Sequence, residues 1–179
     1  VTGNQDNTGA TGVNAIAIGP AATATKAQSI ALGNSATAGG TDSIAIGNGS
    51  VAADKVAPVA IGRGTQANGD FSVALGGGNH QFVGAIANGV GTTALGTYTK
   101  TTAGENFQTA VGFGANTTKS NATAIGYNSA VSTEGGVALG ANSSSSTGRT
   151  VGYNPNDGRT NTYSALTGNV IRSTTGAVA

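Results

Sequence analysis

Ser29-Ile30-Ala31-Leu32-Gly33-Asn34-Ser35-Ala36-Thr37-Ala38 is one copy of a short pattern that recurs along this chain of 179 residues. Its centre is an aliphatic residue (or Thr), Ala, an aliphatic residue and Gly. The glycines that close successive copies are separated by 14, 14, 15, 14, 20, 16, 14 and 14 residues; they are Gly19, Gly33, Gly47, Gly62, Gly76, Gly96, Gly112, Gly126 and Gly140. A fixed short period is typical of a solenoid, in which each repeat stacks on the one before it.

One repeat reads as two short strands joined by two turns. Ile30 and Leu32 point to one side of the first strand and Ala31 to the other, because side chains alternate along a strand. Residues 36–38 form the second strand, with its two alanines on one face and Thr37 on the opposite one. Equivalent strands of successive coils then lie parallel, about 4.8 Å apart. We therefore expect an all-β solenoid of about ten coils, on the order of 50 Å long.

The first strand is apolar on both faces, whereas the thin second strand covers only the alanine side. The large aliphatic residues therefore form a row that a single chain leaves open, and such a stripe is larger than a monomer usually exposes. The alternative is the opposite packing, with the aliphatic side turned inward, which is also sterically possible. From this we predict an obligate homo-oligomer that packs along the row. The row consists of Ile16, Ile18, Ile30, Leu32, Ile44, Ile46, Val59, Ile61, Val73, Leu75, Leu95, Val111, Ile125, Val137 and Leu139.

Charged residues are few and fall outside the repeated strands. They make up 8% of the chain, the net charge is +1 and Cys is absent, so nothing favours a nucleic-acid partner, a thiol site or a disulfide framework. Most lie in the return segment that follows the second strand, as expected for solvated corners of a solenoid. These are Lys26, Asp42, Asp54, Lys55, Asp70, Lys100, Glu105, Lys119 and Glu134.

The repeat resembles the head repeat of trimeric autotransporter adhesins, the YadA-like family of Gram-negative bacteria. The matching stretches include Ser29–Ala38, Ser43–Ala52 and Ser72–Gly76. The resemblance implies a left-handed parallel β-roll, a homotrimer, and a head exposed at the bacterial cell surface. The resemblance also implies a coiled-coil stalk and an anchor in the outer membrane, both in C-terminal parts outside this sequence.

The resemblance also implies a function in attachment and virulence. The expected partners are host extracellular-matrix proteins (collagen, fibronectin or laminin) or a host cell-surface receptor. Along the chain it implies β-roll head repeats over residues 1–152. Residues 153–179 then hold an insertion and the truncated start of a further head module.

The longest departure from the period, between Gly76 and Gly96, marks a candidate ligand-contact loop. It contains Asn79, His80, Gln81 and Phe82, and loops commonly carry binding functions. The alternative is an irregular coil with Phe82 turned inward and His80 in solvent. A second candidate is an aromatic contact patch near the turns of later coils, and the alternative is that these rings merely cover corners of the roll. Its members are Tyr98, Phe107, Phe113 and Tyr127.

An enzyme is not expected, because the acidic residues are scattered and the single His cannot form a metal site by itself. No cofactor is expected either, because the Gly-rich stretches lack the Lys of a phosphate-binding loop. The rival functions are a structural fibre of a phage or cell surface and, less favoured, an ice-binding solenoid. Ice binding requires a regular row of Thr. The outward positions of the second strands are instead predicted to be Thr23, Thr37, Val51, Gln66, Asn116 and Val131.

Overall fold

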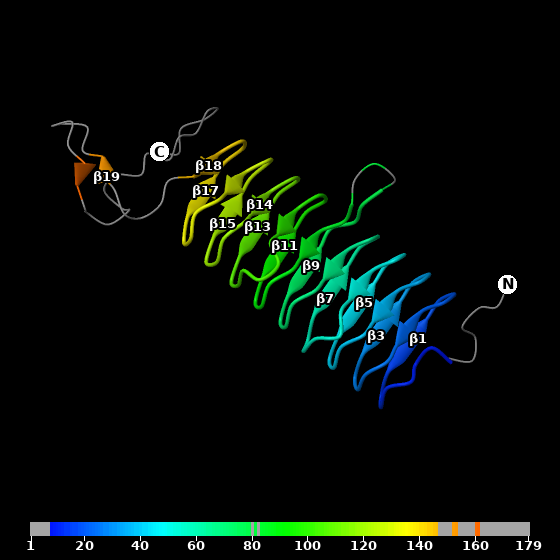
Figure 1. The fold of residues 1–179 in the computed structure, drawn as a ribbon. Helices are drawn as coiled ribbons and strands as arrows, with labels where there is room; N and C mark the ends of the chain where they lie inside the picture. Colours follow the sequence, from blue (N-terminus) through cyan, green and yellow to red (C-terminus); the bar gives the residue numbers. More distant parts are fainter. Residues whose placement is uncertain (1–7, 80, 82, 147–151, 154–159, 162–179) are drawn as a thin grey trace.

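The chain forms a rod of stacked β-coils in a computed structural model that describes residues 8–79, 81, 83–146, 152–153 and 160–161 (Figure 1). Two parallel sheets of nine strands run along the rod, each coil giving one strand to each sheet. The first sheet contains β1 (Ile16–Ile18), β3 (Ile30–Leu32), β5 (Ile44–Ile46), β7 (Val59–Ile61), β9 (Val73–Leu75), β11 (Thr93–Leu95), β13 (Thr109–Val111), β15 (Thr123–Ile125) and β17 (Val137–Leu139). The second contains β2 (Thr23–Ala24), β4 (Thr37–Ala38), β6 (Val51–Ala52), β8 (Gln66–Ala67), β10 (Ile86–Ala87), β12 (Lys100–Thr101), β14 (Asn116–Thr117), β16 (Ala130–Val131) and β18 (Ser144–Ser145).

The register follows the repeat of the sequence from coil to coil. Ile30 lies beside Ile44 and Leu32 beside Ile46, so equal positions form straight columns along the rod. The expected parallel β-solenoid is thereby confirmed. The left-handed winding and the homotrimer stay predictions of the family resemblance.

The interior of the rod is narrow, and its buried apolar residues are almost all alanine, with buried Ser and Thr beside them. Ala31, Ala36 and Ala38 are fully buried there, as the alternation of side chains predicted. Hydroxyl groups close the corners: the Ser43 hydroxyl donates to the Gly40 carbonyl, and the Ser50 hydroxyl to the Gly47 carbonyl. These bonds satisfy backbone acceptors where the chain turns away from the sheets.

The glycine that closes each pattern is required by the stacking. Gly47 has a φ of +129°, which L side chains rarely adopt. A Cβ built on it would also lie 2.7 Å from the carbonyl carbon and oxygen of Gly62 in the next coil. The positive φ recurs along the whole column, and the collision with the next coil recurs from Gly19 to Gly126, which explains why glycine is required at these positions.

Two sequence-based assignments in the second sheet were wrong. Val131 was expected to point outward, but it is 1% exposed, and Ala130 takes the outward position. Val131 lies beside the inward Thr117, in a part of the rod where inward side chains are larger than alanine. Lys100 was placed in the return segment, but it lies within β12 with its side chain exposed.

The longer repeats are accommodated between strands, without a break in either sheet. In Figure 1 the chain leaves the outline of the rod between β9 and β10, where the 20-residue spacing occurs. Beyond the roll, β19 (Gly152–Tyr153) and β20 (Thr160–Asn161) form a short antiparallel pair. The predicted further module over residues 153–179 lies mostly outside the described residues, so the division at residue 152 stays a prediction.

Candidate interaction surfaces of the rod

The outward side of the first sheet is an aliphatic face. Every member of the predicted row, from Ile16 to Leu139, is exposed or half-buried in the single chain. Ile18 is 57% exposed and Leu32 is 40% exposed. In the later strands β11, β13 and β15, one of the two outward columns changes to Thr93, Thr109 and Thr123. The face is therefore fully aliphatic over the first five coils and half aliphatic over the next three.

The outward side of the second sheet is more polar. The exposed Gln66, Lys100 and the half-buried Asn116 lie on this face, and the Thr23 hydroxyl contacts that of Thr37 at 3.4 Å. Thr does not recur regularly along the column, whose outward residue in β16 is Ala130. The array needed for ice binding is therefore missing from the described part of this face.

The two rows of turns that edge the sheets differ in charge. The exit turns run from the first sheet to the second, and the return turns lead back. Among the described residues, Arg63 is the one charged side chain of the exit turns. All the carboxylates of the nine described coils lie in the return segments: Asp42, Asp54, Asp70, Glu105 and Glu134.

The predicted ligand-contact loop is the longest exit turn, and its base is held by hydrogen bonds. Gly78 donates its backbone N–H to the carbonyl of Arg63, a residue of the preceding coil, at 2.7 Å. Tyr98 donates its own N–H to the Val83 carbonyl at 3.1 Å, from the following coil. Gln81 is exposed, and its N–H donates to Oδ1 of Asn79 at 2.8 Å. His80 and Phe82, the other two predicted members, lie outside the described residues.

Three of the four aromatic candidates come together beside this loop. Tyr98, Phe113 and Tyr127 occupy exit turns of three successive coils, where they are 52%, 37% and 53% exposed. The Tyr98 and Phe113 ring centroids are 6.3 Å apart, and those of Phe113 and Tyr127 are 5.9 Å apart with an angle of 19° between the ring planes. We call these three residues the aromatic ladder.

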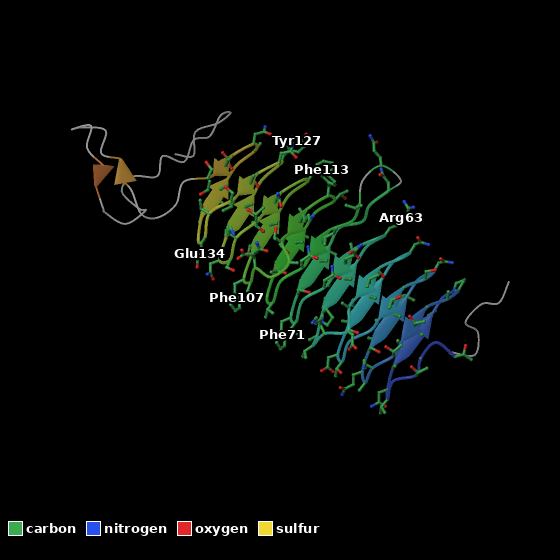
Figure 2. The ribbon with its side chains drawn as sticks, viewed as in Figure 1. Arg63, Phe71, Phe107, Phe113, Tyr127 and Glu134 are labelled. Atoms are coloured by element: carbon green, nitrogen blue, oxygen red, sulfur yellow. The ribbon has the colours of Figure 1, made fainter. Side chains whose placement is uncertain are left out.

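Phe107 does not belong to the ladder. It lies on the opposite edge of the rod with Phe71, as the labelled side chains show (Figure 2). Its ring packs over Gly91, where an added Cβ would lie 3.0 Å from Cδ1 of the ring. Val83, Arg63 and Phe71 also lie on these edges, and the sequence did not predict a contact role for them. The charge of Arg63 in an exit turn was the one signal that could have drawn attention to it.

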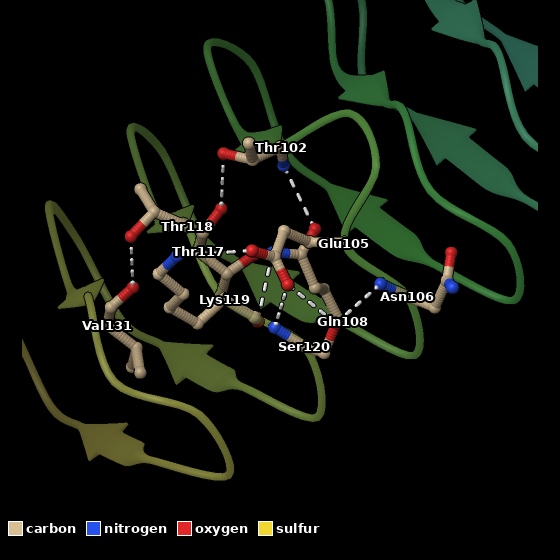
Figure 3. A network of polar contacts seen from close by, with 9 residues as sticks. All are labelled: Thr102, Glu105, Asn106, Gln108, Thr117, Thr118, Lys119, Ser120 and Val131. Carbon is tan, nitrogen blue, oxygen red and sulfur yellow. Dashed lines mark hydrogen bonds and ion pairs between the residues drawn. The ribbon is translucent and has the colours of Figure 1, made fainter. Parts of the chain in front are cut away.

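A polar network occupies the return turn of the 16-residue repeat between Gly96 and Gly112 (Figure 3). The buried Gln108 accepts a hydrogen bond from the Thr102 N–H and donates one to the Lys119 carbonyl. Glu105 accepts from the Ser120 hydroxyl at 2.6 Å and from the Lys119 ammonium at 3.2 Å. The Ser120 bond first, and then the Lys119 bond, hold the pKa of Glu105 below its ordinary value. These contacts explain how the longer turn is fixed to the next coil, so we assign the network a structural role.

Neither a metal centre nor a spanning helix appears in the part of the chain that the structure describes. No three His, Cys, Asp or Glu side chains gather there as metal ligands. None of the described segments is a helix with the length and apolar character to cross a membrane.

The repeat itself is the feature that assigns the chain to a family. The profile of the YadA head domain repeat matches six overlapping or separate stretches, at residues 10–36, 24–50, 38–55, 59–79, 109–129 and 118–143. The chain belongs to the YadA head family. No curated protein matches it. The family is one of adhesin head domains, which indicates an adhesin-like role at a bacterial surface and agrees with the stacked β-coils.

Proposed function

We propose that this chain is the head of a trimeric autotransporter adhesin, in which three copies pack along the aliphatic face. The observation that carries the proposal is the continuous row of exposed or half-buried Ile, Leu and Val side chains on one face of the rod. Full burial of such a side chain stabilises a protein by about 1.5–3 kcal/mol, so covering one that is already half-buried stabilises the assembly by roughly 1 kcal/mol. Repeated over nine coils, this gain favours assembly, and the polar second sheet then faces solvent.

The assembly is tested by a charge placed on the aliphatic face. Ile46→Asp puts a carboxylate among half-buried aliphatic neighbours of β3 and β7, where it would be desolvated on assembly. We expect the variant to dissociate and unfold together, measured by analytical ultracentrifugation and circular dichroism. Gln66→Asp is the matched control, because the same charge then lies on the exposed second sheet. A folded, soluble Ile46→Asp monomer would count against the proposal.

The adhesive function is non-catalytic and multivalent in this proposal. Three identical lateral surfaces on one rod raise the avidity for a repeated or immobilised target without a deep pocket. The partner is a host extracellular-matrix protein such as collagen, fibronectin or laminin, or a host cell-surface receptor. The direct test is binding of the purified chain to immobilised matrix proteins and to cultured host cells. Absence of binding to every one of these surfaces would refute an adhesive function.

A further inference from the structure

We propose that the described exit-turn edge of the rod, from Arg63 to Tyr127, binds an acidic glycan chain of the host-cell surface. We call this strip the aromatic edge. The inference rests on the adhesive function proposed above and names the chemistry of one ligand.

The rings concentrate apolar surface on an otherwise polar edge. The whole chain has only four Tyr and four Phe, and three of these eight rings lie side by side in the ladder. Turns in the earlier coils carry the small or polar residues Asn34, Asn48 and Arg63 near the same place. The C–H groups of a pyranose ring pack on aromatic surface, which provides a large apolar contact at low entropic cost.

Amide side chains lie next to the rings. Asn128 and Asn142 are exposed in the last two exit turns of the roll. A Cβ added to Gly114 would collide with Oδ1 of Asn128, so this amide lies over Gly114, directly beside Phe113 in the chain. An amide offers both donors and acceptors, which match the hydroxyl groups of a sugar.

The charge of the edge favours an acidic sugar over a neutral or basic one. Among the described exit turns there is a guanidinium at Arg63 and no carboxylate, whereas the carboxylates lie across the rod. Figure 2 shows Arg63, Phe113 and Tyr127 along one side and Glu134 on the other. A guanidinium pairs with a carboxylate or sulfate through two parallel hydrogen bonds.

The shape of the strip favours a chain-like ligand. From the coil of Arg63 to that of Tyr127 there are four coil steps, or about 19 Å along the rod at about 4.8 Å per step. The strip is only one turn wide, whereas a standard protein–protein interface needs about 800 Å² on each partner. An extended glycan that follows the rod axis fits both the length and the narrow width of the strip.

The test measures binding of the 179-residue chain to immobilised glycans: neutral, sialylated, uronic-acid-bearing and sulfated oligosaccharides, with acidic peptides as the competing class. We expect binding to acidic glycans, weakened roughly tenfold or more in Phe113→Ala and in Arg63→Gln. Phe71→Ala is the matched control, since it removes an exposed ring from the opposite edge. Circular dichroism and ultracentrifugation must show that all variants keep the fold and assembly of the parent chain.

Three results would overturn the inference: no binding to any acidic glycan, binding equal in the parent and Phe113→Ala proteins, or binding only to acidic peptides. A cell experiment separates this failure from failure of the adhesive function. Beads coated with the chain are applied to epithelial cells before and after periodate oxidation of the cell-surface glycans. Attachment that is lost on oxidation supports the glycan ligand. Attachment that survives both oxidation and Phe113→Ala refutes the glycan and retains the adhesin.

Discussion

Replacing Gly47 by Ala tests the physical basis of the repeat. At φ = +129° the backbone lies in a region that costs a non-glycine residue about 1–3 kcal/mol. The new Cβ would also lie 2.7 Å from the Gly62 carbonyl. Because that atom belongs to the backbone of a paired coil, relief requires the coils to shift, at about 1–3 kcal/mol as for an overpacked core. We expect a total loss of roughly 2–6 kcal/mol.

Two other glycines separate the two contributions to this loss. Gly49 has φ = +63° and no heavy atom within 4 Å of an added Cβ, so Gly49→Ala should cost only about 1–2 kcal/mol for a left-handed residue. Gly140 belongs to the same column as Gly47, with φ = +101°, but no described atom lies within 4 Å of its Cβ. Gly140→Ala should therefore show the backbone cost without the collision.

The free energy of unfolding is measured for all three variants by urea denaturation followed by circular dichroism. The expected order of destabilisation is Gly47→Ala, then Gly140→Ala, then Gly49→Ala. A Gly47→Ala protein as stable as Gly49→Ala would refute the argument that coil stacking excludes a side chain at this position.

Two further predictions concern polar groups in the later coils. Thr117→Val should raise the free energy of unfolding by about 1–2 kcal/mol, because its buried Oγ1 has no hydrogen-bond partner among the described residues. Thr101 lies beside Thr117 in the same column, and its hydroxyl accepts a hydrogen bond from the Asn88 N–H. Thr101→Val should therefore lower the free energy of unfolding by about 1–3 kcal/mol. Equal effects of the two substitutions in urea denaturation would contradict these opposite expectations. The lowered pKa of Glu105 means that its carboxylate stabilises the fold above the ordinary carboxyl pKa, and that this contribution disappears as the pH falls through the lowered folded-state value. Thermal unfolding between neutral and acidic pH should therefore depend less on pH in Glu105→Gln and in Ser120→Ala, and unchanged profiles would show that the network is not coupled to stability.

Most of the fold could be predicted because the period and the alternation act together. A constant repeat length forces equal positions into columns, and alternation then assigns Ala31 to the interior and Ile30 and Leu32 to the outside. Steric limits explain both choices, since the narrow interior accepts alanine and few larger residues. The pattern placed the aliphatic residues together on one face, and the structure decided between the two possible packings by leaving that face open.

The errors arose where the sequence departs from the type repeat. In β16 the pair Ala130–Val131 reverses the usual order of outward and inward size, so the smaller residue faces solvent. The interior beside it already contains Thr101 and Thr117, so the space is shaped for a branched side chain. Lys100 was misplaced because its repeat has two extra residues before Gly112, and sequence spacing does not indicate on which side of the strand they lie.

The sequence alone determined the type of fold, since a 14-residue period with small inward residues has one economical packing, a stack of parallel coils. It also determined which aliphatic side chains share one face, whereas the structure decided that this face is the open one. Only the tertiary structure decided that Tyr98, Phe113 and Tyr127 lie in contact and that Phe107 lies across the rod. The physical reason is that a shift of a few residues within a coil moves a side chain from one edge to the other. Where the repeat length varies, that shift is set by how each turn packs on its neighbours.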